Sequence, residues 1–174
     1  MSQNPYAPPK YVPPTFSHTA NGELELASLG QRFAGAFLDG LIMLAIVFPL
    51  GFGLGFALVL SGMDPEGVQF SVLTTVVGAA IGIGVFLALN GYLLASRGQT
   101  IGKYVLGTQI QSDDGQLMPF GSLILKRYVP LWVVSHIPWV GGIVSLVNAL
   151  VIFRANRKCL HDEIAGTKVV VLRQ

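Results

Sequence analysis

The sequence predicts an all-α membrane protein with two transmembrane helices and a third apolar segment. Composition is the first observation: the 174 residues are 52% hydrophobic and 11% charged, with a mean hydropathy of +0.60. Soluble domains carry about a quarter charged residues. The second observation is that two long stretches hold almost no charge, and the third is that the Lys and Arg residues cluster outside them. Such clustering is the topology signal of membrane proteins.

The two predicted transmembrane helices cover residues 33–60 and 71–95. A helix needs about 20 apolar residues to cross a bilayer, and both stretches exceed that length. The first contains a single charged residue, Asp39, and the second contains none. Their short connection carries Asp64 and Glu66 but no Lys or Arg, which places it outside the cell.

The third apolar segment, residues 128–153, is interrupted by Pro138 and by glycines 141–142. It predicts either a third crossing or a re-entrant helical hairpin. The two arms, residues 128–137 and 140–153, would be about 15 and 21 Å long, which is short of the roughly 30 Å of a bilayer core. A single crossing would also put the basic C-terminal tail outside the cell, so the positive-inside rule favours the hairpin. The basic residues of this tail are Arg154, Arg157, Lys158, Lys168 and Arg173.

Polar segments flank and separate these helices. Residues 1–28 form a proline-rich tail with five of the ten prolines in its first 14 residues, and we expect it to be disordered and cytoplasmic. Residues 29–174 form the membrane domain. Within it, Asp114-Gly115 lies between short alternating runs and predicts a small cytoplasmic β-hairpin. The β-branched run near the C-terminus predicts a short strand.

Asp39 is the unusual residue, because a charge inside the bilayer costs at least about 2.5–3.5 kcal/mol. Asp39, Asn90 and Asn148 each lie six or seven residues from an arginine predicted to mark the cytoplasmic surface. They would therefore share one depth, about 10 Å from that surface. We expect one buried polar layer of these three residues, provided that the hairpin forms. The alternative is that each Asn only satisfies a helix–helix contact.

Three motifs resemble the RDD family of bacterial membrane proteins, which is named for one arginine and two aspartates. RFAGAFLDGLI carries Arg32 and Asp39, and LHDEIAGTKVV carries Asp162. The third motif, GQTIGKYVLGTQI, follows the second helix. Its recurring residues are Gly98, Thr100, Gly102, Lys103 and Gly107. The resemblance extends over about residues 29–171 and implies a multi-pass protein of the bacterial plasma membrane, with the N-terminus and, if the hairpin forms, the C-terminus in the cytoplasm.

The resemblance implies a function only weakly, because transport of unknown ligands and cation/proton antiport are proposals for this family. We expect a transport component for a small ion or solute, with Asp39 as the exchangeable carboxylate. Replacing Asp39 with Asn should then abolish transport and leave insertion intact. The alternative is a membrane scaffold or accessory subunit that binds a partner protein, in which the motif residues only lock helices together.

Arg32 is expected to point toward the cytoplasmic surface, where it could form a bidentate pair with Asp162. The alternative is that Asp162 caps a short turn beginning at His161.

Two or three membrane segments rarely enclose a pathway alone, so a homo-oligomer in the lipid bilayer is expected.

Other classes of function find little support in the sequence. The three histidines and one cysteine lack metal-ligand spacing, and no cofactor motif is present. No nucleophile–base set indicates an enzyme. The 11 basic residues form no dense stripe, which argues against nucleic-acid binding.

Overall fold

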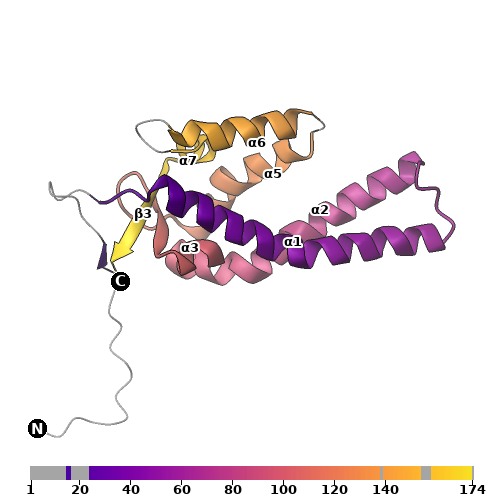
Figure 1. Ribbon diagram of the computed structural model, residues 1–174, viewed down its shortest axis with the longest axis horizontal. Helices are drawn as coiled ribbons and strands as arrows, with labels where there is room; N and C mark the ends of the chain where they lie inside the picture. The colour runs from indigo at the N-terminus through magenta and orange to yellow at the C-terminus, as the bar shows by residue number, and fades with distance from the viewer. Residues whose placement is uncertain (1–14, 17–23, 138, 154–157, 174) are drawn as a thin grey trace, which may run out of the picture.

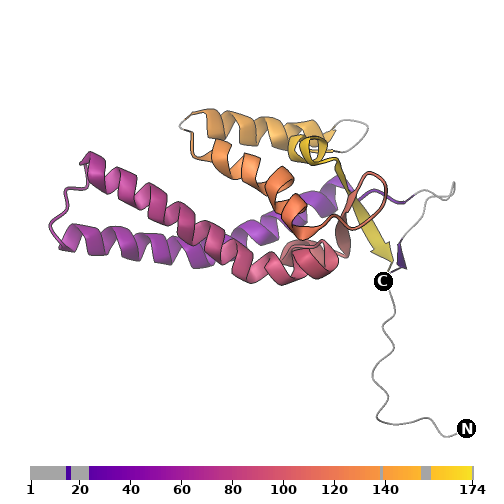
Figure 2. The ribbon, with the colours of Figure 1, turned by 180° about the vertical axis from the view of Figure 1, so that it is seen from behind.

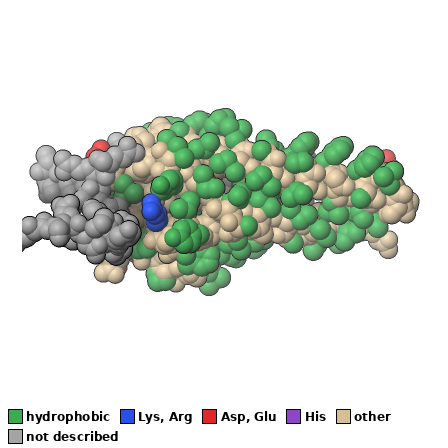
Figure 3. Space-filling view, turned by 90° about the horizontal axis from the view of Figure 1, so that it is seen from below, with side chains coloured by type: hydrophobic (Ala, Val, Ile, Leu, Met, Phe, Trp, Pro, Cys, Tyr) green, Lys and Arg blue, Asp and Glu red, His purple; other side chains and the backbone are tan. Residues whose placement is uncertain are grey.

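The computed structural model describes residues 15–16, 24–137, 139–153 and 158–173. Two long helices, α1 (Leu29–Leu60) and α2 (Val68–Arg97), lie side by side as an antiparallel hairpin (Figure 1). Both are long and apolar enough to cross a membrane, and they correspond to the two helices that the sequence predicted. Their side chains are largely exposed, and hydrophobic side chains cover the surface along most of the molecule (Figure 3).

Local sequence explains where these helices begin and end. Ser28 caps the first turn of α1, and the Gln31 side chain accepts a hydrogen bond from the Ser28 backbone in return. Gly98 ends α2 in the left-handed conformation, with φ of 61°. A side-chain carbon at this position would lie 2.7 Å from the Ile110 carbonyl oxygen, so only glycine fits.

A small antiparallel sheet lies at the end of the molecule opposite the α1–α2 turn (Figure 1). Its strands are β1 (Thr15–Phe16), β2 (Thr108–Ser112) and β3 (Thr167–Arg173), in the order β1-β3-β2. β3 is the short strand predicted near the C-terminus. The sheet therefore gathers an N-terminal segment, the connection after α2 and the C-terminal tail at one end.

The predicted β-hairpin around Asp114-Gly115 is wrong in its pairing. The turn itself forms, since the Gly115 amide donates to Ser112 O and the Ser112 amide donates to Gln116 O, each at 2.9 Å. The residues after the turn lead into α4 (Phe120–Leu123) rather than a second strand. β2 pairs instead with β3, with Ile110 opposite Val169. A turn motif is local, whereas the choice of partner strand depends on the whole fold.

The predicted disordered tail, residues 1–28, lies mostly outside the described residues. Its described parts differ from that prediction because they pair with β3. Thr15 and Phe16 form β1, Leu26 bridges Val170, and the Ala27 amide donates to Val169 O at 2.9 Å.

The third apolar segment folds into short helices. The π-helical turn η1 (Ile124–Tyr128) leads into α5 (Val129–Ser135), and α6 (Val140–Leu150) and the 3₁₀ turn η2 (Val151–Phe153) follow. α5 and α6 lie side by side as a second, shorter hairpin (Figures 1 and 2). Among the described residues, only α1 and α2 have the length to cross a membrane.

The buried core lies under the sheet and not between the long helices. The second hairpin is attached to α2 by aromatic contacts, with the Phe86 ring centroid 4.9 Å from Tyr128 and 5.4 Å from Trp132. α7 (Leu160–Ala165) then connects the hairpin to β3. The core cluster comprises Ala27, Leu94, Ile110, Leu123 and Val169.

Candidate functional site

Asp39 holds the N-terminus of a short helix, α3 (Ile101–Val105). Its carboxylate accepts hydrogen bonds from the Thr100 hydroxyl and, at 2.7 Å, from the Gly102 amide. Asn90 of α2 accepts from the Ile101 amide at 2.9 Å. The first amides of a helix have no partner within it, so Asp39 and Asn90 satisfy two of them from the two long helices.

α3 packs against α1 at a point where both helices carry glycine. A side chain added at Gly102 would collide with the Gly35 carbonyl oxygen and with Asp39. The backbones therefore approach each other directly, and this approach brings the Gly102 amide within reach of Asp39.

The expected polar layer is divided between two places. Asp39 and Asn90 meet at the same helix end, although no hydrogen bond joins them among the described residues. Asn148 belongs to α6, and its side-chain oxygen lies 2.8 Å from His161 Nδ1 and accepts from the His161 amide at 3.3 Å. The arginine from which its depth was counted, Arg154, lies outside the described residues.

Asp162 is fully buried at the start of α7 and is paired with two arginines. Arg32 Nη1 lies 2.9 Å from one carboxylate oxygen, and Arg127 Nη1 is paired with the other. The structure thus brings Arg32 and Asp162 together. The contact is made by a single guanidinium nitrogen of Arg32, whereas the sequence analysis considered a bidentate pair. Arg32 also donates to Val169 O at 3.3 Å, which ties the first turn of α1 to β3.

Further donors complete the surroundings of the Asp162 carboxylate. The Cys159 amide donates at 3.1 Å and the Thr167 hydroxyl at 3.3 Å. Asp162 therefore also caps α7, whose N-cap is Cys159 rather than His161. Four donors occupy the two oxygens, which is about the number of acceptor sites a carboxylate offers.

Arg127 is the main residue of this network that the sequence analysis missed. Its side chain is only 3% exposed, and it donates to Thr167 Oγ1 at 2.6 Å. In the sequence, Arg127 is only one of the Lys and Arg residues that cluster outside the two long apolar stretches. A signal was present, because Arg127 stands just before an apolar segment as Arg32 does.

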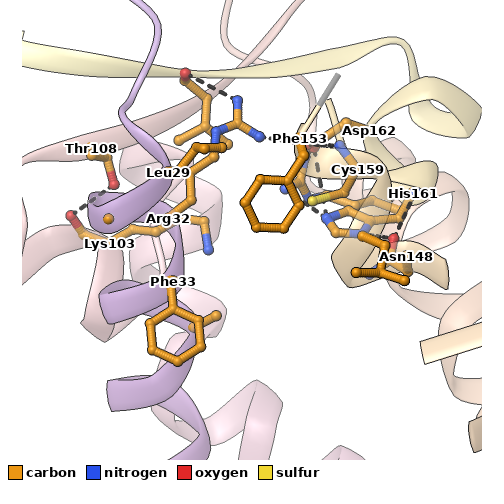
Figure 4. Close-up of a pocket in the computed structure, with 15 residues that line it drawn as sticks. Leu29, Arg32, Phe33, Lys103, Thr108, Asn148, Phe153, Cys159, His161 and Asp162 are labelled. Carbon is orange, nitrogen blue, oxygen red and sulfur yellow. Dashed lines mark hydrogen bonds and ion pairs between the residues drawn. The ribbon is translucent and has the colours of Figure 1, made fainter. Parts of the chain in front are cut away.

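Beside this network lies a pocket of about 610 Å³ (Figure 4). Its walls come from the first turns of α1, from α3 and η1, from the end of α6 with η2, from the start of α7, and from one residue each of β2 and β3. Three cationic side chains line it against one carboxylate, Asp162. The cations are Arg32, Lys103 and Arg127.

Lys103 is the charged residue of the third motif that lines this pocket, and its side chain extends toward the open middle (Figure 4). Its ammonium makes no hydrogen bond or ion pair with any residue that the structure describes. Burial lowers the pKa of Lys103 to about 8, with a further contribution from the Arg127 charge. The ammonium therefore remains mostly protonated at pH 7.

Cys159, His161 and Asp162 place three metal-ligand types within 4.8 Å of one another. Asp162 is already occupied by two guanidinium groups, and both ring nitrogens of His161 have partners, Asn148 and Arg127. A metal ion would have to displace these contacts and face two fixed positive charges. The cluster therefore fits an ion-pair network better than a metal centre.

The charges of this network shift the pKa values of its members. Burial alone would raise the pKa of Asp162, but the Arg127 guanidinium, with His161 and Arg32, holds it well below its usual range. Burial, together with Arg127, lowers the pKa of His161 to about 3. Burial raises the pKa of the Cys159 thiol. At neutral pH the network thus contains ionised Asp162, neutral His161 and protonated thiol.

We expect the folded protein to lose about 2 kcal/mol of unfolding free energy between pH 7 and pH 5, because of His161. In this range the unfolded chain binds a proton at His161, whose ordinary pKa is 6.5, whereas the folded chain binds it only near pH 3. Asp162 adds to the loss only as the pH falls below 3.8, the ordinary pKa of an aspartate, because its pKa in the folded chain is lower still. Thermal unfolding in detergent at several pH values measures this effect. In His161→Gln, the loss between pH 7 and pH 5 should be much smaller; an unchanged loss would contradict the assignment.

Two long apolar helices with a small polar end are typical of a membrane protein. The RDD family model matches residues 26–166, and the chain belongs to the RDD family. The match confirms the resemblance carried by the three motifs. Comparison with curated proteins and with solved structures finds no match.

The structure gives each residue of the third motif a place around α3. Gly98 ends α2, Thr100 caps α3 and bonds Asp39, and Gly102 allows the contact with Gly35. Gly107 has φ of 61° and turns the chain into β2. Of the five recurring residues, Lys103 lines the pocket, as does Thr108 from the same stretch.

Proposed function

We propose that this protein is a solute-binding component of membrane transport, and that the pocket beside Asp162 is where the solute binds. The observation that carries the proposal is the Lys103 ammonium, which faces the pocket without a partner among the described residues. Leaving a partly desolvated charge unpaired is costly, and such groups are concentrated at functional sites.

The charge of the pocket favours an anion as the solute. The cations that line it exceed its one carboxylate. Asp39 was expected to be the exchangeable carboxylate, but it is not among the residues that line the pocket, and it accepts two hydrogen bonds at the end of α3. A cation exchanged at Asp39 would have to displace these donors. The contacts therefore support anion binding at Lys103 better than cation/proton exchange at Asp39.

Reconstituted protein in vesicles tests this proposal through charge displacement on a solid-supported membrane. The probes are inorganic phosphate and acetate as anions, and Na⁺ and K⁺ as cations under a pH gradient. We expect a response to an anion, reduced at least tenfold in Lys103→Gln and unchanged in Lys126→Gln. Lys126 is a matched control because it is exposed, lies outside this pocket and carries the same charge. A response to cations alone that disappears in Asp39→Asn would contradict the proposal and favour exchange at Asp39.

The proposed topology places both termini and the sheet in the cytoplasm of a bacterial plasma membrane. Support comes from the sheet, because β1, β2 and β3 bring three polar segments to one end, and from the basic residues of those segments. The α5–α6 hairpin would then enter the membrane and return without crossing. Paired cytoplasmic and external reporters fused after Gln174 should give a cytoplasmic signal. An external signal would mean a third crossing, which is incompatible with pairing between β2 and β3.

A scaffold without transport activity is the second candidate. The contacts of Arg32, Asp39 and Asp162 favour it, because each of these residues joins separate segments of the chain. In that case Arg32→Ala should release one stoichiometric membrane partner in a pull-down, and Lys103→Gln should have no effect on the partner.

A transport pathway, by contrast, would need several copies of a chain with so few membrane segments, so we propose a homo-oligomer.

A further inference from the structure

The pocket lies at the level where lipid headgroups are found. α1 has 32 residues and is about 48 Å long at 1.5 Å per residue, whereas a bilayer core is about 30 Å thick. Arg32 is in the first turn of α1, so it falls outside the hydrocarbon core when the helix is centred in it. Lys103, Arg127 and Asp162 surround the same end of α1. The polar part of the pocket therefore faces the headgroup region.

Exposed apolar side chains line another part of the pocket. Phe33 of α1 and Phe153 of η2 are each 72% exposed, and Leu150 of α6 is 55% exposed. These side chains line the pocket from α1, α6 and η2, and Figure 4 shows Phe33 on the α1 side and Phe153 nearer Cys159 and Asp162. A ligand that fills this pocket thus meets cations in one part and exposed apolar side chains in another.

Two hydrogen-bond donors in the pocket lack partners among the described residues. One is the Lys103 ammonium. The other is Arg32 Nε, a buried atom on a side chain that is only 5% exposed. Burying a donor without a partner costs about 1–3 kcal/mol, and more for a charged group. An anionic oxygen between Arg32 and Lys103 would satisfy both donors.

The charges around this position leave room for one anion. Arg32, Lys103 and Arg127 contribute three positive charges, Asp162 contributes one negative charge, and Asp39 contributes another from behind α3. One positive charge remains in excess, since His161 is neutral at pH 7. A phosphodiester carries one negative charge and would balance it.

Building on the proposed use of this pocket as a binding site, we propose that it takes an anionic phospholipid. The phosphate lies between Arg32 Nε and the Lys103 ammonium, and an acyl chain passes between Phe33 and Phe153 into the bilayer. Basic pockets beside membrane helices bind anionic headgroups in this way. The exposed apolar rim favours a lipid over a soluble phosphate, because a water-borne anion would gain nothing from Phe33, Leu150 or Phe153.

Native mass spectrometry of the full-length protein tests the proposal without any transport assay. The protein is exchanged into detergent with phosphatidylglycerol, with phosphatidylcholine of the same acyl chains, or with glycerol 3-phosphate. We expect phosphatidylglycerol to be retained at one copy per chain and at least tenfold more than phosphatidylcholine. Lys103→Gln should weaken this retention about tenfold, and Lys126→Gln should leave it unchanged.

A second variant keeps the test valid if Lys103→Gln folds poorly. Ala36→Phe fills the pocket from an exposed position of α1 and leaves the charged side chains in place, so it should also reduce retention. Equal retention of the two lipids, or retention unchanged in both variants, would overturn the proposal. So would equal binding of glycerol 3-phosphate, which would assign the site to a soluble phosphate compound.

The inference and the proposed function fail in different ways. Retention of phosphatidylglycerol without any anion-driven charge displacement would support the lipid site and contradict the proposed transport function. Anion-driven charge displacement that depends on Lys103, without selective lipid retention, would support the proposed transport function and contradict the lipid site.

Discussion

Replacing Asp162 with Asn is expected to lower the free energy of unfolding by about 3–5 kcal/mol, the usual cost of breaking a buried ion pair. Asn has nearly the same shape, so the loss would come from charge and not from packing. Arg32 and Arg127, with side chains 5% and 3% exposed, would face each other without a counter-charge. Because Arg32 belongs to α1 and Arg127 to η1, the C-terminal segment would detach from both. Thermal unfolding in detergent and protease cleavage after α6 measure the two effects.

Two comparisons show whether the buried charge is responsible. Glu66→Gln removes an exposed carboxylate from the connection between α1 and α2, far from this network, and should change stability by less than about 0.5 kcal/mol. The triple variant Arg32→Met, Arg127→Met, Asp162→Leu removes all three charges together. It should recover much of the lost stability, as replacement of a buried ion-pair triad by apolar residues commonly does. A triple variant as unstable as Asp162→Asn would contradict a role limited to charge balance.

The two long helices could be predicted from the sequence because their signal is local. A stretch of more than 20 residues with at most one charge stays apolar whatever surrounds it, so α1 and α2 follow from composition alone. The structure adds a few residues at the start of α1 and at both ends of α2, and Ser28 and Gly98 set the start of α1 and the end of α2. The RDD motifs were likewise recognisable, since each is a short continuous stretch of sequence.

The partners of the motif residues could not be predicted in the same way. Asp39 was singled out because a charge is costly in a membrane helix, yet its partner is the backbone of α3, more than 60 residues away along the chain. Nearly every residue has a backbone amide, so a sequence does not show which amide a side chain will contact. Arg127 likewise looked like an ordinary charge at the membrane surface, and only the position of α7 turns it toward Asp162.

The error at the β-hairpin has the same origin. Asp114-Gly115 correctly indicated a turn, because glycine at a positive φ is a property of the turn itself. The partner strand lies more than 50 residues later, and it is chosen by the packing of α7 and β3 against the end of α1. Local patterns therefore located turns and helices, whereas the site depends on contacts between distant segments.

Asp39→Ala is expected to lower the free energy of unfolding by about 2–3 kcal/mol, because it leaves the Gly102 amide and the Thr100 hydroxyl without their acceptor. Asp39→Asn should cost only about 1 kcal/mol, since its amide oxygen can still accept from Gly102. Glu66→Gln, in the exposed connection between α1 and α2, is the control for loss of one carboxylate. Unfolding in detergent gives the three values.

The same pair of variants separates the two roles considered for Asp39. If Asp39 only caps α3, transport activity should follow stability, so Asp39→Asn should retain most activity and Asp39→Ala should lose more. If Asp39 exchanges a proton or cation, both variants should lose all activity, whatever their stability, because an amide cannot ionise. Since Gly102 and Lys103 are adjacent, a displaced α3 would also move the Lys103 ammonium in the pocket. Loss of activity in Asp39→Ala that a stabilising condition restores would therefore assign Asp39 to positioning Lys103.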